Sequence, residues 1–178
     1  AQSVSISSES APVEYYRMPD YPLPKEYSTY SSNLDMSFTE LSKSGFTESY
    51  LTDTYLKLEG YKQVNKNPDV EITATVGEFI VWSELRNTNK NKTKDKNGVE
   101  QVRYTYSMTV KYSQPMGLQV FNKEGKTLID KYVFTMSDTR SWTSSTYSSM
   151  SDLDSYLRIQ RKTKLSDLQK DLMKEGMN

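Results

Sequence analysis

The side chains of this sequence that could carry acid–base chemistry near neutral pH are carboxylates, because its 178 residues include no histidine and no cysteine. Asp69 and Glu71 take alternate positions of a predicted strand, which places them on one face about 6.6 Å apart; Glu78 and Glu84 follow. A pair of acids at such a distance is typical of glycoside hydrolysis. Acids two residues apart on a solvated sheet face also occur by chance. We favour that second interpretation, so the sequence predicts no catalytic residue and no enzyme.

A second candidate site is aromatic. Trp142 and Tyr147 lie in a Ser/Thr-rich stretch, residues 137–151, that reads as a loop. Aromatic faces with neighbouring hydroxyls suit the stacking of a sugar, so these two residues are the candidate binding residues. The alternative, which we favour for Trp142, is that its ring fills the junction between the sheet and the last helix.

Composition excludes several further classes of function. Without thiols or imidazoles there are no thiol nucleophiles, no Ser/His triads and few routes to a zinc, copper or haem site. Only seven glycines are present and they never cluster, so no phosphate-binding loop exists. We therefore predict no cofactor and no metal.

Charge and hydropathy bound the partners. The 23 basic and 23 acidic side chains cancel, which does not favour nucleic acid. Residues 90–96 carry four lysines, diluted by asparagines and Asp95, and we interpret them as a solvated hairpin tip rather than an anion-binding patch. No apolar run approaches the roughly 18 residues that a membrane-spanning helix needs, so the chain is predicted not to be transmembrane.

The residues named above must be positioned by a sheet whose clearest strand is 103–112. Its tyrosines, Met108 and Val110 alternate strictly with polar residues, which predicts a central antiparallel strand with one buried face. Asn97-Gly98 predicts a hairpin turn, with residues 87–97 forming a long mobile tip. In residues 69–82 the apolar positions change parity after Gly77, which predicts a β-bulge or sharp bend within one strand.

The remaining elements follow from periodicity and caps. A first strand is predicted at 27–38, and a helix at 47–59 with Gly60 just past its end. Residues 118–121 and 127–136 predict a second hairpin. From Ser151 the pattern is helical, as one long helix or as two with a break near residues 162–164.

These elements predict an α+β fold: an antiparallel meander sheet of about five or six strands, with two helices packed on one face. The domain covers residues 27–178. Residues 1–26 form a Ser-, Pro- and Tyr-rich extended N-terminal arm, because four prolines there prevent a helix. The arm is predicted to lie on its own domain rather than to act as a free linker.

The start of the chain also bears on location. It begins with Ala1-Gln2 and a polar, Ser-rich stretch, as if a secretory signal peptide had been removed. The alternative is a chain trimmed at its start. We expect a periplasmic or extracellular protein exported through a cleaved signal peptide.

Four segments resemble a family of small bacterial envelope lipoproteins of unknown function. They are residues 27–35, Leu58-Glu59-Gly60-Tyr61, Asn67-Pro68-Asp69-Val70 and residues 117–134, which include Gly125-Lys126-Thr127-Leu128-Ile129-Asp130. The resemblance implies a compact α+β domain at the envelope and no catalytic residues. The chain departs from the family in lacking a cysteine for lipidation and in its Lys/Asn hairpin and Tyr-rich arm, which are closer to a secreted Bacteroidetes-type protein.

Taken together, the sequence predicts a secreted or envelope-associated, non-enzymatic interaction or assembly module. Its binding surface would be the free sheet face or the N-terminal arm and hairpin. Its partner would be another envelope protein or a glycan. The alternative is a carbohydrate-binding or carbohydrate-active protein that uses Trp142 and Tyr147 or a pair of acids.

Overall fold

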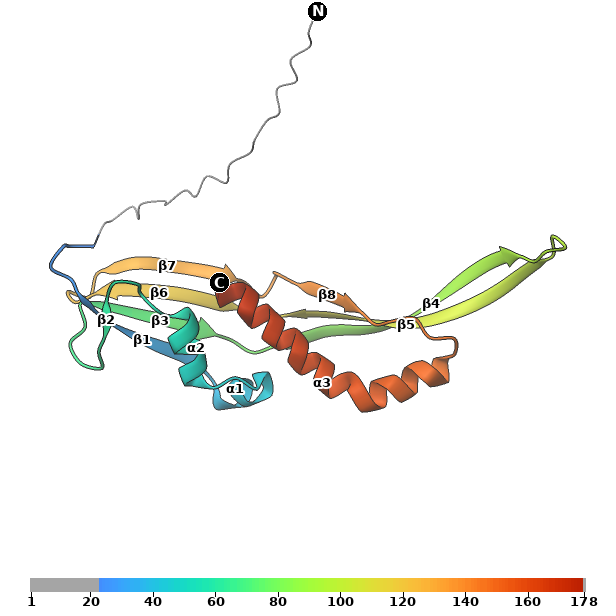
Figure 1. Ribbon diagram of the computed structural model, residues 1–178, viewed down its shortest axis with the longest axis horizontal. Helices are drawn as coiled ribbons and strands as arrows, with labels where there is room; N and C mark the ends of the chain where they lie inside the picture. The colour runs from blue at the N-terminus through green and yellow to red at the C-terminus, as the bar shows by residue number, and fades with distance from the viewer. Residues whose placement is uncertain (1–22, 178) are drawn as a thin grey trace, which may run out of the picture.

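The computed structural model describes residues 23–177 and has an α+β fold (Figure 1). The strands are β1 (Thr29–Met36), β2 (Lys62–Gln63), β3 (Val70–Val76), β4 (Ile80–Lys94), β5 (Glu100–Ser113), β6 (Met116–Asn122), β7 (Thr127–Phe134) and β8 (Arg140–Thr143). The helices are α1 (Phe38–Ser44), α2 (Glu48–Tyr55) and α3 (Met150–Met177). Most of the predicted N-terminal arm lies outside the described residues; of its last part, Leu23 packs against the core.

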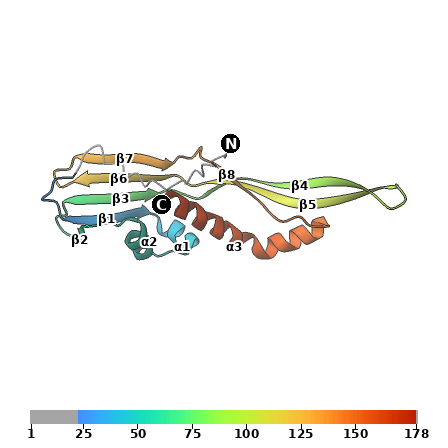
Figure 2. The same cartoon turned by 45° about the horizontal axis from the view of Figure 1, so that its top comes forward.

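The strands form two sheets rather than the predicted single antiparallel meander. Sheet A has the order β2-β1-β3-β6-β7 and is mixed, because β1 runs parallel to both β2 and β3. Sheet B has the order β4-β5-β8 and is antiparallel. The prediction failed at β1, which joins β3 through a crossover that contains α1 and α2, and such a crossover makes the joined strands parallel. The sheets follow one another along the long axis of the molecule, with the helices on one side (Figure 2).

A single interrupted hairpin joins the two sheets. β3 pairs with β6 in sheet A, β4 pairs with β5 in sheet B, and the hairpin closes at the tip of β4 and β5. Between the two ladders the Gly77 amide donates to the Pro115 carbonyl (2.9 Å), and the Gln114 side chain donates to the Gly77 carbonyl (3.0 Å). The parity change at Gly77 is therefore a bend, but the chain leaves one sheet and enters the other there, so the prediction of one continuous strand was wrong.

The helices cover one face of sheet A. Four alternate residues of β3 are buried against them, and the intervening residues Glu71, Thr73 and Thr75 face outward. Residues 23–177 contain three helices, where two were predicted. The missed one, α1, begins after Ser37, whose hydroxyl accepts from the Glu40 amide, and ends at Gly45 in the left-handed conformation.

Helix α2 begins at the predicted cap, because the Thr47 hydroxyl accepts from the Tyr50 amide (3.2 Å). It ends at Leu56, short of the predicted end near Gly60. Helix α3 is one continuous helix of 28 residues. It lies along both sheets, because Arg161 bonds to Glu84 of sheet B and Gly176 lies beside Met116 of sheet A. The Ser166 hydroxyl donates to the Lys43 carbonyl of α1 (2.7 Å), so it joins two helices instead of starting a new one.

Candidate functional site

The outermost part of the β4–β5 hairpin, residues 89–105, is named the β-arm here. In Figures 1 and 2 it extends away from the rest of the molecule, past the end of α3. The last contacts between this ribbon and the body lie just before it: an ion pair of Arg86 with Asp154 (2.7 Å) and a backbone bridge of Tyr106 with Tyr147. Over the described residues, no hydrogen bond or ion pair joins the β-arm to the rest of the chain. The β-arm therefore stands clear of the core.

The two faces of the β-arm differ in chemistry, because directly opposed residues of an antiparallel pair share a face. One face carries the row Lys90, Lys92 and Lys94. Opposite this row on β5 stand Tyr104, Val102 and Glu100. The other face carries asparagine, threonine, glutamine and Arg103. One face is thus cationic with apolar neighbours, and the other is rich in amides and hydroxyls.

The predicted mobile tip was drawn too long. Residues 87–94 belong to β4 and pair with β5, so the turn is confined to residues 95–99. Within it the Asp95 carboxylate accepts from the Asn97 and Val99 amides, each at 2.9 Å, and Gly98 has a φ of 78°. The Asn-Gly hairpin prediction is confirmed. Tyr104, which the alternation placed on a buried face, is 48% exposed because no helix reaches that far.

Two of the four carboxylates considered for catalysis, Asp69 and Glu84, make structural bonds instead. Asp69 accepts from the Ser28 amide (2.9 Å) and from the amide and hydroxyl of Thr29 (3.1 and 2.9 Å). These bonds, with the Ser28 amide foremost, lower the pKa of Asp69 to about 2. Glu84 accepts from the Nε and Nη2 of Arg161 (3.0 and 2.6 Å to Oε1). Glu71 is exposed on the outer face, and within residues 23–177 no three acids gather in a way that could hold a metal ion.

Trp142 and Tyr147 lie at the seam between sheet B and α3. Trp142 belongs to β8, opposite Val110, so part of the predicted loop is a strand. Its ring packs against the core, with the Lys164 ammonium 5.1 Å from the ring centre. Tyr147 contacts the ring of Tyr156 (5.4 Å), and burial raises the pKa of its hydroxyl. Both side chains are half-buried, which favours a packing role, and their binding of sugar stays a prediction.

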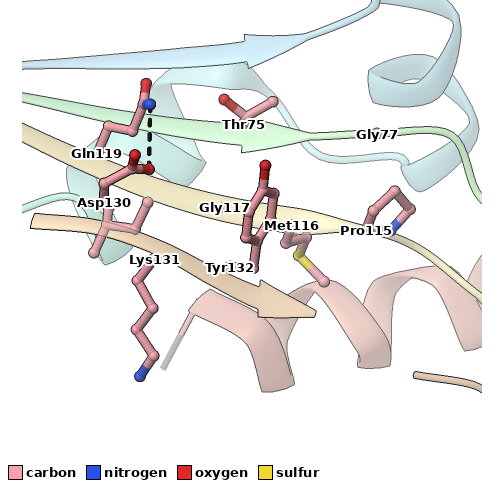
Figure 3. Close-up of a pocket in the computed structure, with 10 residues that line it drawn as sticks. Thr75, Gly77, Pro115, Met116, Gly117, Gln119, Asp130, Lys131 and Tyr132 are labelled. Atoms are coloured by element: carbon pink, nitrogen blue, oxygen red, sulfur yellow. Dashed lines mark hydrogen bonds between the residues drawn. The ribbon is translucent and has the colours of Figure 1, made fainter. Parts of the chain in front are cut away.

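A shallow hollow of about 240 Å³ lies on the outer face of sheet A (Figure 3). Gly117, which has no side chain, and Tyr132 are among the residues that line this hollow. The Tyr132 side chain is 79% exposed. Gln119 donates to the Asp130 carboxylate across β6 and β7 (3.3 Å). The sequence analysis named the free sheet face as one possible binding surface, and this hollow lies on that face.

Comparisons with known proteins include a distant likeness to a solved structure. No protein-family model matches the chain, and no curated protein matches it. Among solved structures, the chain is similar to a minor lipoprotein from Acinetobacter baumannii, at 14% identity over 84% of this chain and 91% of that one. The TM-score is 0.22, which is too low to establish a shared fold, and the match does not support a Bacteroidetes-type protein.

The sequence analysis considered the lysines of residues 90–96 and interpreted them as a solvated hairpin tip, but it did not predict that Lys90, Lys92 and Lys94 form a row on one face of a strand. The signal was present: from Asn89 to Lys94, lysine alternates with asparagine or threonine, and an alternation of period two predicts a strand even where both faces are polar. It was overlooked because neither face is apolar. The exposed Trp82, whose indole donates to Ser113 (2.8 Å), was likewise not singled out.

Proposed function

We propose that this protein is a non-enzymatic, exported interaction module that binds a partner macromolecule through its β-arm. The observation that carries the proposal is the β-arm itself. None of the β-arm residues belongs to the hydrophobic core. The β-arm is nevertheless the outer part of β4 and β5, which are the longest strands among the described residues. A two-stranded ribbon is marginally stable alone in water, because it lacks a third strand or a covering helix. Contact with a partner would supply what the fold does not.

The absence of a catalytic role is part of this proposal. It is supported by the structural bonds of Asp69 and Glu84, two of the four acids that the sequence offered for catalysis. Export is proposed because four segments of the sequence resemble small bacterial envelope lipoproteins. Over residues 23–177 no helix is long and apolar enough to cross a membrane.

The test uses a short-arm variant that lacks residues 89–94 and 100–105. Because each deletion removes an even number of residues, the two strands keep their faces, and the turn at 95–99 is joined to Thr88 and Tyr106. We expect unchanged circular dichroism and nearly unchanged melting temperature, since no core residue is lost. The immobilised full chain should retain a partner from a cell-envelope fraction, identified by mass spectrometry, and the short-arm variant should not.

The matched control is Tyr132→Ser, which alters the hollow on the outer face and leaves the β-arm intact. It should retain the same partner as the full chain. Loss of the partner in Tyr132→Ser, with retention by the short-arm variant, would assign binding to the sheet face and refute the proposal.

A further inference from the structure

We propose that the free edge of β4 in the β-arm binds an acidic, extended polypeptide segment of another protein, which adds to the ribbon as a third strand. This inference rests on the proposed function and names the chemistry of its partner.

The first argument is the open backbone edge. β4 is an edge strand of sheet B, and its residues 89–94 pair on one side only, with β5. In an antiparallel ladder, half of the amides and carbonyls of an edge strand point away from its partner. Within the described residues no backbone hydrogen bond takes these groups. A row of free donors and acceptors of this kind is a template for strand addition.

The second argument is charge. Lys90, Lys92 and Lys94 repeat every second residue, about 6.8 Å apart along the strand. On the β5 side, Glu100 already pairs with Lys92 (2.7 Å). Lys90 and Lys94 make no ion pair within residues 23–177. The ion pair of Lys92 with Glu100 is an example of an acid on a neighbouring strand that binds a lysine of this row. A strand added on the other side of β4 would lie beside the same three lysines, so acidic side chains on it could pair with them.

The opposite face sets the rest of the partner's chemistry. There Asn89, Asn91 and Thr93 present amides and a hydroxyl. β5 meets this face with polar side chains, as in the contact of Asn91 with Thr105 (3.5 Å). A complementary strand would therefore alternate acidic residues with Ser, Thr or Asn.

Charge argues against a second copy as the occupant. All three lysines share one parity, so two copies of β4 paired in a continuous sheet would bring lysines together on one face, where like charges repel. Lysines on an edge strand are a common means of preventing such self-pairing. An anionic glycan or nucleic acid could meet the lysines but would leave the backbone edge unused.

The test measures binding of a synthetic peptide, Thr-Glu-Thr-Glu-Thr-Glu-Thr, to the ¹⁵N-labelled full chain. We expect the peptide to slow amide hydrogen exchange at alternate residues within 89–94, the ones that face the free edge. The variant K90Q/K92Q/K94Q should bind the peptide about tenfold more weakly, because three exposed ion pairs are lost. The control K57Q/K62Q/K66Q removes the same charge from exposed lysines elsewhere, and it should bind normally.

Four results would overturn the inference. The first is that the acidic peptide does not bind, and the second is that it binds without slowing hydrogen exchange at the β4 edge. The third is that a Thr-Lys peptide binds equally well. The fourth is that sedimentation shows a dimer, which the variant K90Q/K92Q/K94Q makes more stable. Stronger binding of heparin, protecting no edge amide, would instead assign the row to an anionic glycan. If the peptide does not bind but the short-arm variant still loses its partner, the inference is refuted and the proposed function is not. If the short-arm variant retains the partner, both the inference and the proposed function are refuted.

Discussion

The buried carboxylate of Glu40 ties together three parts of the molecule, and its removal should destabilise the fold. One oxygen accepts from the Lys43 ammonium (2.6 Å). The other accepts from the Phe79 amide (3.0 Å), where the chain passes from sheet A to sheet B, and from the Gln169 side chain of α3 (2.9 Å). Glu40 is only 3% exposed. Glu40→Ala would leave the Phe79 and Gln169 donors without an acceptor.

The expected cost follows from these two donors. A buried donor left unsatisfied costs about 1–3 kcal/mol, whereas the exposed Lys43 can return to water. With the lost packing, Glu40→Ala should lower the free energy of unfolding by about 3–5 kcal/mol and the melting temperature by on the order of 10 °C. Glu40→Gln keeps an oxygen for Phe79 and Gln169 and should cost about 1 kcal/mol.

The pH dependence has a definite sign. Burial alone would raise the pKa of Glu40, but the bonds from Lys43, the Phe79 amide and Gln169 outweigh it, so the pKa is lowered from its ordinary value of 4.5. A lowered pKa stabilises the folded state above pH 4.5, and the contribution is lost as the pH falls through the folded-state pKa. The difference between the wild type and Glu40→Gln should therefore shrink in acid.

The assay is urea unfolding followed by tryptophan fluorescence at pH 7 and at pH values below 4.5. Ser42→Ala is the matched control, since Ser42 is exposed on the same helix. If Glu40→Ala costs no more than Ser42→Ala, the carboxylate does not join the three elements and the reasoning is refuted.

Three further predictions concern other positions. Gly77→Ala should lower the free energy of unfolding by about 1–3 kcal/mol in urea titrations, because an added Cβ would lie 2.6 Å from Pro115 Cγ; an unchanged midpoint would contradict the bend. Asp69→Asn should remove stability above pH 4 and little below pH 2, since the pKa of Asp69 is lowered to about 2; equal losses at both pH values in thermal melts would disprove this. Trp142→Ala should cost about 2 kcal/mol, and a stable variant that loses binding to a glycan array would instead favour the sugar platform.

The local elements were predictable where caps and periodicity are strong. The Asn-Gly hairpin and the start of α2 at Thr47 were both found from sequence, because a turn or cap depends on a few neighbouring residues. Helix α1 was missed although Ser37 and Glu40 have the spacing of a capping box. In the structure the Glu40 carboxylate bonds to Phe79 instead of to the cap, so tertiary contact decided its role.

The arrangement of sheets was not predictable in the same way. Nothing local to β1 states that it pairs in parallel with β3, because that choice depends on the crossover through α1 and α2. The change of parity at Gly77 signals a bend, but whether a strand continues in its sheet or enters another depends on distant partners such as Pro115. The alternation that forms the lysine row is present in the sequence. Its separation from the rest of the molecule is a tertiary property, because α3 begins at Met150 and the last contacts of the ribbon are with residues near that start, Tyr147 and Asp154.

The measurement that tests the central claim most directly is site-specific photo-crosslinking in cells of the organism that makes the protein. A photoreactive amino acid would replace Asn91 on the β-arm or, as the control, the exposed Glu59 beyond α2. The account predicts a discrete crosslinked partner from position 91 and none from position 59. A partner captured at position 59 and absent at position 91 would contradict it.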